Sequence, residues 1–371
     1  MNKPTKPHDT AFKQQRIWSF FPTHESSTVA VIMFIVAMVF IPIGASIVIA
    51  SDSIFELDVR YDTINHCKFP QGYAGNWSGC DAKATFTLSK SIAAPVYIYY
   101  RLVGFYQNYR TYQESLYESQ LNGNSGTSAD TCIPFRYPGE NNGASQTSAG
   151  ISNLKYSDFT YAPCGAVAWS MFNDSIALYK VPDASLVNTS SLALPVGATV
   201  VCVGGDFQAD GTNTNAQNQC QKQGIALSVD TSTRFKLPIG SNIWTYNGNP
   251  ASTDPFLSNG YYANETGHKI PLQTDEDFIV WTRSAALPDF RKLYRIITAD
   301  LVAGDYLVDV TEYFDTSSFQ GEKHFVLATR SWIGAQHYVL GIFILVLGCF
   351  AFCVGIAVIV LKCIGVRPRQ E

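Results

Sequence analysis

Two long apolar stretches dominate the hydropathy pattern of the chain. They occupy residues 28–50 and 338–361, and neither contains an ionisable side chain. Each is long enough to cross the hydrocarbon core of a bilayer as a helix, which takes about 20 residues. A cleaved signal peptide is the alternative for the first stretch, but the apolar run is too long and follows a polar start of 27 residues. The pattern therefore predicts two membrane-spanning helices.

The segment between the two stretches, residues 51–337, is long enough to bury a core of its own. Several runs in it alternate apolar and polar residues and favour β-branched or aromatic types, which predicts half-buried antiparallel strands. These runs cover residues 84–90, 94–106, 305–314 and 323–330. Polar pieces rich in Gly, Asn and Ser at residues 121–130, 137–150 and 204–219 indicate surface loops. The expected fold is two transmembrane α-helices flanking a large β-rich α+β domain with antiparallel sheets.

Residues 277–297 combine both kinds of pattern. A strand is expected from Phe278 to Trp281, and Pro288 is typical of the first turn of a following helix. In that helix the apolar residues Phe290, Leu293, Tyr294 and Ile297 share one face, which leaves Arg291, Lys292 and Arg295 for solvent or a partner. An ordinary amphipathic core element is the favoured interpretation, because apolar stripes at this spacing are usually core. Arg283, Arg291 and Arg295 are the candidate partner contacts of this stretch.

Charge sets the expected orientation in the membrane. Basic residues precede the first stretch and follow the second, and the positive-inside rule places such flanks in the cytosol; they are Lys3, Lys6, Lys13, Arg16, Lys362, Arg367 and Arg369. Residues 1–27 and 362–371 are then cytosolic tails, and residues 51–337 are lumenal or extracellular. That segment holds 19 Lys and Arg against 27 Asp and Glu, a formal charge of −8. Nucleic acid is excluded as a partner, because it requires clustered basic surface.

Cysteine usage agrees with an oxidising compartment for the large segment, since an even number falls there. The six are Cys67, Cys80, Cys132, Cys164, Cys202 and Cys220, while Cys349, Cys353 and Cys363 lie in or beside the second span. Six cysteines allow 15 connectivities, and pairing of sequence neighbours closes the shortest loops. No C-x-x-C spacing occurs, so no thiolate metal site is expected.

Four N-glycosylation sequons lie in the large segment and none lies in either tail. They begin at Asn76, Asn173, Asn188 and Asn264. This distribution agrees with the topology drawn from charge, and we expect these asparagines to carry glycans.

Enzymatic chemistry finds little support in the sequence. The large segment offers His66, His268, His324 and His337 as general bases, and none is near a nucleophile signature such as G-x-S-x-G. The acidic residues lack the spacing of a calcium loop. We expect no catalytic residues, no cofactor and no metal. Transport by this chain alone is equally disfavoured, because a polar solute needs polar groups at membrane depth.

The two spans carry features that favour packing against other helices. Gly341, Gly348 and Gly355 recur every seven residues, which places them along one face where another helix can approach closely. Pro42 and Gly44 weaken the outer part of the first span, where a freed carbonyl would require a neighbour. These five residues are therefore candidate contacts with a partner.

The segment before the first span mixes basic and aromatic residues. Phe12, Lys13 and Arg16 are suited to the membrane interface, where rings lie at headgroup level and cations meet anionic lipid. The cytosolic domain of a partner could use the same three residues, so membrane lipids and a partner protein both remain candidates.

Several short motifs together resemble one family. They are "TAFKQQR" and "IPIGA" around the first span, "FYQN", "SQLNG", "APCGAVAWSMFND", "DFIVWTRSAALPDFRKLYR" and "SWIGAQHYVLG". In this order and topology the chain resembles the cell-division-control-50 and ligand-effect-modulator family over nearly its whole length. Members of that family are two-span accessory (β) subunits of type IV P-type ATPases, the flippases that move phospholipids to the cytosolic leaflet.

The resemblance implies a heterodimer in which the ATPase α-subunit hydrolyses ATP and carries the lipid. The accessory subunit would allow its partner to leave the endoplasmic reticulum and would support its cycle, with residence in endoplasmic reticulum, Golgi or endosomal membranes and plasma membrane. Cys67 with Cys80 and Cys132 with Cys164 match family bridges, and Asn173 matches a family glycosylation position. A stand-alone lumenal binding module or receptor is the alternative function.

Overall fold

The computed structural model describes residues 10–14, 16–17, 26–64, 80–124, 128–189, 193–265 and 267–365. The chain forms two compact units. One unit contains the residues up to Ile54 and those from Ser331 onward, and the other runs from Phe55 to Arg330. The first holds both apolar stretches and the second holds the strand-rich segment.

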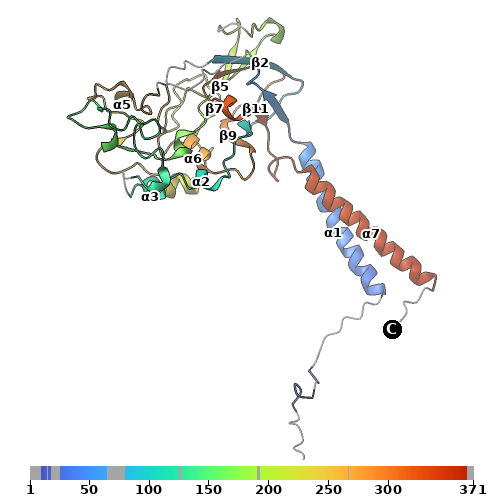
Figure 1. Cartoon of the computed structure of the whole chain (residues 1–371). Helices are drawn as coiled ribbons and strands as arrows, with labels where there is room; N and C mark the ends of the chain where they lie inside the picture. The colour runs from blue at the N-terminus through green and yellow to red at the C-terminus, as the bar shows by residue number, and fades with distance from the viewer. Residues whose placement is uncertain are drawn as a thin grey trace, which may run out of the picture. The chain divides into compact units, whose positions relative to one another are not determined.

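The first unit contains two long helices. Helix α1 spans Ser26–Asp52 and helix α7 spans Tyr338–Cys363, and both are long and apolar enough to cross a membrane. They lie side by side (Figure 1) and pack through contacts such as the edge-to-face pair of Phe34 and Phe352, with ring centroids 5.6 Å apart. Pro42 lies inside α1 without ending the helix.

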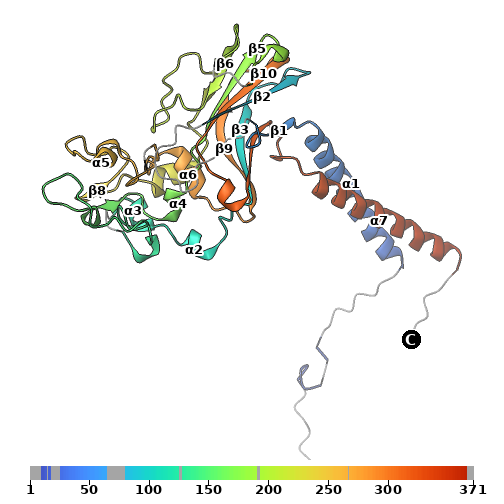
Figure 2. The ribbon, with the colours of Figure 1, turned by 45° about the horizontal axis from the view of Figure 1, so that its top comes forward.

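The Phe55–Arg330 unit contains two antiparallel sheets, as the alternating pattern predicts. The first sheet has the order β1 (Glu56–Arg60), β11 (Glu322–Ala328), β3 (Val96–Val103), β9 (Asp289–Ile297) and β7 (Cys220–Gln221). The second has the order β2 (Cys80–Leu88), β10 (Gly304–Glu312), β5 (Ser175–Val181) and β6 (Thr199–Val203). Figure 2 shows the strands of the second sheet side by side. A small parallel pair joins β4 (Thr160–Tyr161) to β8 (Ile243–Trp244).

Short helices and turns connect the strands. The helices are α2 (Arg110–Gln113), α3 (Glu118–Leu121), α4 (Ala166–Trp169), α5 (Pro255–Asn259) and α6 (Glu276–Thr282). Single turns of 3-10 helix cover Asp130–Cys132, Tyr156–Asp158, Ala184–Leu186 and Ser317–Phe319, and a π turn covers Asp230–Arg234. Residues 204–219, between β6 and β7, form the loop that their composition predicts.

The main core lies between the two sheets. Alternate residues of β3, namely Val96, Ile98 and Leu102, are buried in one cluster with Val308 and Val310 of β10. A second cluster surrounds the fully buried Trp244 and gathers the loops on either side of the disulfide that joins Cys132 to Cys164. Its other buried aromatic members are Phe135, Tyr156, Phe159, Tyr161 and Tyr262. Burial of this apolar surface is the main stabilising term for the unit.

The predicted elements of residues 277–297 are wrong in both halves. Residues Glu276–Thr282 form helix α6, whose start is capped by the Asp275 carboxylate accepting a hydrogen bond from the Asp277 amide at 2.8 Å. Four consecutive residues of the helix, Phe278–Trp281, are buried. Their sequence is therefore a continuous apolar run, and such a run is also typical of a buried strand.

The second half, Asp289–Ile297, is a strand paired with β3. Its register shifts between Ile98 and Tyr99, so that Arg295 pairs with Ile98, Leu293 pairs with Tyr99, and Tyr294 is the extra residue of a β-bulge. The bulge changes the phase of the side-chain alternation. Tyr294 and Ile297 consequently both reach the main core at a spacing that a helix would also give.

Candidate functional site

The three candidate arginines of residues 277–297 lie in different surroundings. Arg295 is 3% exposed, and its guanidinium binds the Asp277 carboxylate at 2.7 Å and the carbonyl oxygen of Gly204 at 2.6 Å. It lies over the rings of Phe207 and Tyr294. The prediction that Arg295 faces solvent or a partner is therefore wrong, because the strand and its bulge direct the side chain inward. It is wrong for Lys292 as well, which is buried and whose ammonium donates to the Val280 carbonyl oxygen at 3.3 Å.

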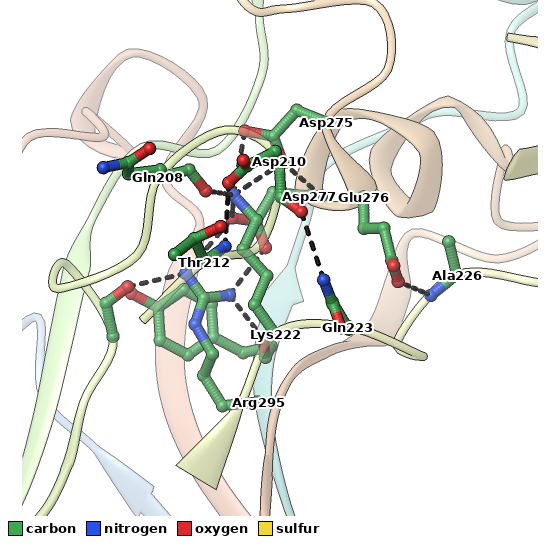
Figure 3. Close-up of polar contacts among 12 residues, drawn as sticks. Gln208, Asp210, Thr212, Lys222, Gln223, Ala226, Asp275, Glu276, Asp277 and Arg295 are labelled. Carbon is green, nitrogen blue, oxygen red and sulfur yellow. Dashed lines mark hydrogen bonds and ion pairs between the residues drawn. The ribbon is translucent and has the colours of Figure 1, made fainter. Parts of the chain in front are cut away.

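A buried ion cluster surrounds Arg295 (Figure 3). The ammonium of Lys222, the residue directly after β7, lies 2.7 Å from Asp275 and 3.0 Å from Asp277 at the start of α6. The Asp277 carboxylate is shared, since Arg295 donates to both of its oxygens and Lys222 binds one of them, Oδ2. We call Lys222, Asp275, Asp277 and Arg295 the ion cluster; its two cations and two carboxylates balance.

The environment of the ion cluster shifts the acidity of its carboxyl groups. Burial opposes ionisation of Asp277, but the charges of Arg295 and Lys222 outweigh it and hold the pKa of Asp277 below its usual range. Burial, together with the neighbouring Asp277 charge, raises the pKa of Asp275 to about 6. Because every charge has an opposite partner within 3.0 Å, the cluster is suited to fixing the 204–219 loop, α6 and β9 to one another.

A large cavity of about 690 Å³ lies beside the ion cluster. Its walls include Lys222 and Arg295 as well as the aromatic side chains of Tyr100, Phe172 and Tyr294. The volume lies within the range of small-molecule sites, about 300–1,000 Å³. His268 also lines this cavity, but its Nδ1 atom lies 2.5 Å from Glu265. The contacts of His268 are those of a packed core side chain.

The outer face of the first sheet carries a network of ion pairs that the sequence analysis missed. Arg101 of β3 binds Asp58 of β1 at 2.7 Å and Asp289 of β9 at 2.6 Å. The other members are Glu56, Arg60, Arg291, Glu322 and His324, joined by the pairs Arg291–Glu56, Arg60–Glu322 and His324–Asp58. We call these eight residues the charged sheet face. Solvent-exposed ion pairs contribute only about 0–1 kcal/mol each to the stability of a fold. The charged sheet face is therefore also a candidate surface for binding a partner.

Arg283 and Arg291 keep the surface position expected of partner contacts. Arg283 has a half-exposed side chain that binds Asp230 at 2.7 Å. Arg291 belongs to the charged sheet face and its guanidinium lies 5.1 Å from the centre of the Tyr99 ring. Charged and apolar residues alternate in "ELDVR" (56–60). This alternation could have predicted β1, the edge strand that contributes Glu56, Asp58 and Arg60 to the charged sheet face.

The glycines of the membrane helices pack α7 against α1 of the same chain. A Cβ atom on Gly44 would lie 2.7 Å from the backbone nitrogen of Leu345, and one on Gly348 would lie 3.0 Å from that of Ile41. Gly341 and Gly355 face Val48 and Phe34 in the same way. The spacing of the glycines correctly indicates a close helix approach. Their assignment to a separate partner is wrong, since the approaching helix is the chain's own.

The remaining candidate contacts in this unit are exposed. Pro42 is exposed on α1, and Phe12, Lys13 and Arg16 are exposed in the segment before it. Large apolar side chains also project outward from the helices; among them are Val31, Met38, Val339 and Phe350. These outward faces are suited to lipid or to another apolar helix.

The structure contains the disulfides Cys132–Cys164 and Cys202–Cys220, the pairings of sequence neighbours. Cys80 is also disulfide-bonded, and its expected partner Cys67 lies outside the described residues. Asn76 likewise lies outside them. Asn188 and Asn264 are exposed, while Asn173 is half-buried at the edge of a groove.

Comparison with known proteins gives consistent matches along the chain. The family model described as LEM3 (ligand-effect modulator 3) family / CDC50 family matches residues 47–370. Cell cycle control protein 50A of Mus musculus is 32% identical over 386 residues, which cover 97% of this chain and 90% of that protein. ALA-interacting subunit 3 of Arabidopsis thaliana is 31% identical over 380 residues, covering 98% and 88% of the two chains.

A human relative, cell cycle control protein 50B of Homo sapiens, is 29% identical over 382 residues, with 96% of this chain and 93% of that protein covered. The family match spans the last residues of α1, the whole Phe55–Arg330 unit and α7. The chain therefore belongs to the LEM3/CDC50 family.

Proposed function

We propose that this chain is a non-catalytic accessory subunit of a type IV P-type ATPase that moves phospholipids to the cytosolic leaflet. The observation that carries the proposal is the family match over residues 47–370, joined to relatives that are named interacting subunits. A protein named for its interaction with another acts through binding, and the extended surfaces of this chain suit that role.

The membrane helices support an accessory rather than a transporting role. The seam between α1 and α7 is closed by backbone contacts at Gly44 and Gly348. A lipid headgroup crossing the hydrocarbon core needs polar or charged groups at depth, and residues 28–50 and 338–361 contain no ionisable side chain. The transport pathway accordingly belongs to the ATPase partner.

Two surfaces are suited to hold that partner. The outward faces of α1 and α7, with Val31, Met38, Val339 and Phe350 exposed, fit against the transmembrane helices of an ATPase or against lipid. The charged sheet face offers many charged side chains that could form ion pairs with the ATPase in place of the pairs within the sheet. Charge complementarity of this kind orients two proteins on one another and makes their association specific.

The proposed topology places both termini in the cytosol and the Phe55–Arg330 unit in the lumen or outside the cell. There the disulfides persist and the sequons at Asn76, Asn173, Asn188 and Asn264 carry glycans. As an obligate partner, the subunit would help the ATPase to fold and to leave the endoplasmic reticulum for Golgi, endosomal and plasma membranes.

The test is purification of the tagged chain from its native membranes in mild detergent. We expect a large ATPase to co-elute in equal amount, to form an aspartyl phosphate from ATP, and to lose that phosphate faster when phospholipid is added. Sensitivity of the label to hydroxylamine identifies an acyl phosphate. A monodisperse glycoprotein without an ATPase, reproduced in several gentle detergents, would instead establish a stand-alone binding module or receptor.

A further inference from the structure

We propose that a groove beside Asn173 holds the first sugars of the N-linked glycan attached to that residue. The inference rests on the lumenal topology of the proposed function, because only a lumenal asparagine receives such a glycan. The inference goes beyond the proposed function, because it assigns a binding site for the glycan within the Phe55–Arg330 unit. The groove is independent of the surfaces proposed to bind the ATPase.

The groove has a volume of about 420 Å³, within the range of small-molecule sites of about 300–1,000 Å³. Its walls are mainly aromatic and include Phe105, Trp169, Tyr313 and Phe319. Asn173 itself lines the groove, so the glycan would begin at the wall of the space that it is proposed to fill. We call this space the Asn173 groove.

The backbone on both sides of Asn173 is fixed by burial. Phe172 is 5% exposed and its ring stacks on Tyr100 with centroids 3.9 Å apart. Asp174 is 3% exposed, and its carboxylate accepts hydrogen bonds from the hydroxyl of Tyr61 at 2.8 Å and from the amide of Phe314 at 2.6 Å. The burial of both neighbours fixes the backbone position from which the Asn173 side chain projects.

The Asn173 side chain is available for modification. Although half-buried, it makes no hydrogen bond within the part of the chain that the structure describes. Half-buried amide groups are normally hydrogen-bonded, and a side chain whose nitrogen is linked to a sugar satisfies that requirement through the sugar. Asn188 and Asn264, in contrast, are exposed and do not line the Asn173 groove.

The aromatic walls suit a sugar ring. The C–H faces of a pyranose are apolar and stack on aromatic faces, while the hydroxyl and acetamido groups need polar neighbours at the edge. Asp315 and Ser318 line the groove and supply such neighbours. Trp169 is held in place by stacking on Phe135 at 4.7 Å and by donating its indole N–H to Glu265 at 3.0 Å. The site is therefore formed before the sugar enters, which lowers the entropic cost of binding.

The larger cavity next to the groove also includes Asn173 in its wall. Its polar groups include those of the ion cluster, whose cations already bind carboxylates at 2.7–3.0 Å. A neutral sugar entering there would have to compete with these pairs. The Asn173 groove offers aromatic surface without that competition, and the inference is specific to it.

The experiment measures release of each glycan from the folded, full-length protein by peptide N-glycosidase. Site-specific glycopeptide mass spectrometry follows Asn173 and Asn264 over time. We expect release at Asn173 to be about ten-fold slower than at Asn264, equivalent to about 1.4 kcal/mol of protection. After denaturation the two sites should react at the same rate.

Two variants test whether the glycan lies in the Asn173 groove. Phe319→Ser removes an aromatic wall, and Ser318→Phe fills the groove from an exposed position. Each should bring release at Asn173 close to the rate at Asn264 while leaving Asn264 unchanged. Val196→Ser is the matched control, since Val196 is fully exposed and does not line the groove, and it should keep the slow release.

Three results would overturn the inference. The first is equal release at Asn173 and Asn264 in the native protein. The second is slow release at Asn173 that persists in both groove variants, which would place the glycan in the larger cavity. The third is an unmodified Asn173 beside occupied Asn188 and Asn264; absence of glycan from all of these sites would instead contradict the lumenal topology of the proposed function.

Discussion

The Arg295 guanidinium and the Asp277 carboxylate form an ion pair of 2.7 Å between strand β9 and helix α6, and only 3% of the Arg295 side chain is exposed. Lys222 binds the second oxygen of the same carboxylate. Breaking a buried pair by removing one member leaves an uncompensated charge and costs about 3–5 kcal/mol. The ion cluster is therefore expected to be sensitive to the loss of any one member.

Arg295→Met should therefore destabilise the protein strongly. A loss of about 3–5 kcal/mol corresponds to a melting temperature lower by roughly 10 °C for a unit of this size. Arg291→Met is the matched control, because its pair with Glu56 is partly exposed and worth about 0–1 kcal/mol. Tryptophan fluorescence follows the transition, since Trp244 and Trp281 are fully buried. Equal shifts in the two variants would contradict this assignment, and Asp277→Asn should partly restore Arg295→Met.

The membrane helices and the regular strands could be predicted from the sequence. Both spans show long apolar runs, and β10 places Tyr306, Val308 and Val310 at a period of two in the main core. Such local periodicity needs no knowledge of the partner strand. The glycine spacing in α7 was similarly informative about close approach, although it could not identify which helix approaches.

The ion cluster and the charged sheet face could not be predicted in this way. Arg101 meets Asp58 across 43 residues of chain and Asp289 across 188. Such pairs depend on strand order, which local periodicity does not contain. The bulge at Tyr294 removed the period of two from β9 and produced a helical spacing. The Asn173 groove likewise arises from segments that meet only in the folded chain.

Alanine substitutions at two glycines of the membrane helices should distinguish a close backbone contact from a looser side-chain contact. At Gly44 a Cβ atom would meet the backbone of Leu345 at 2.7 Å, whereas at Gly355 it would meet the end of the Phe34 ring at 3.2 Å. Gly44→Ala should cost about 1–3 kcal/mol through overpacking. Gly355→Ala should cost less, because a side-chain ring can move.

The measurement is the temperature at which half of the protein remains monodisperse in detergent, by size-exclusion chromatography. Alanine has the better intrinsic helix propensity by about 1 kcal/mol, so any loss at Gly44 reflects packing. If Gly355→Ala lowered this temperature as much as Gly44→Ala, the packing of α1 against α7 through Gly44 would be refuted.

A second buried group gives the protein a pH dependence. The Lys323 ammonium lies 2.8 Å from both Asp174 and Glu312, so that one cation faces two carboxyl groups. Burial, opposed in part by Lys323 and reinforced by the charge of Asp174, raises the pKa of Glu312 to about 7. An unfolded glutamic acid has a pKa of about 4.3. Between these values the folded protein binds more protons than the unfolded chain.

The contribution of Glu312 to the free energy of unfolding should consequently fall as the pH rises from about 4.3 to about 7, and should then level off. Glu312→Gln keeps the shape of the side chain and removes this contribution, so its melting temperature should change less between pH 5.5 and pH 8 than that of the wild-type protein. Glu322→Gln makes the same charge change on the charged sheet face, and should keep the wild-type profile. An identical pH profile in wild-type protein and Glu312→Gln would show that Glu312 is ionised throughout.

The disulfide between Cys132 and Cys164 should be required for export of the protein. It closes a loop of 32 residues, and both half-cystines are buried in the cluster around Trp244. The chain-entropy relation gives a loss of about 3–4 kcal/mol when a loop of this length is opened. Marginal stability makes such a loss large enough to expose the aromatic cluster to quality control in the endoplasmic reticulum.

A variant carrying Cys132→Ser and Cys164→Ser should therefore retain immature, high-mannose glycans and be depleted from later membranes, together with any ATPase that depends on it. The control carries Cys349→Ser and Cys353→Ser, which are free and exposed on α7, and it should mature normally. The measurement is the fraction of each protein whose glycans resist an endoglycosidase specific for high-mannose chains. Normal maturation of the Cys132/Cys164 variant would refute the requirement, since the opened loop would then be tolerated by the folded unit.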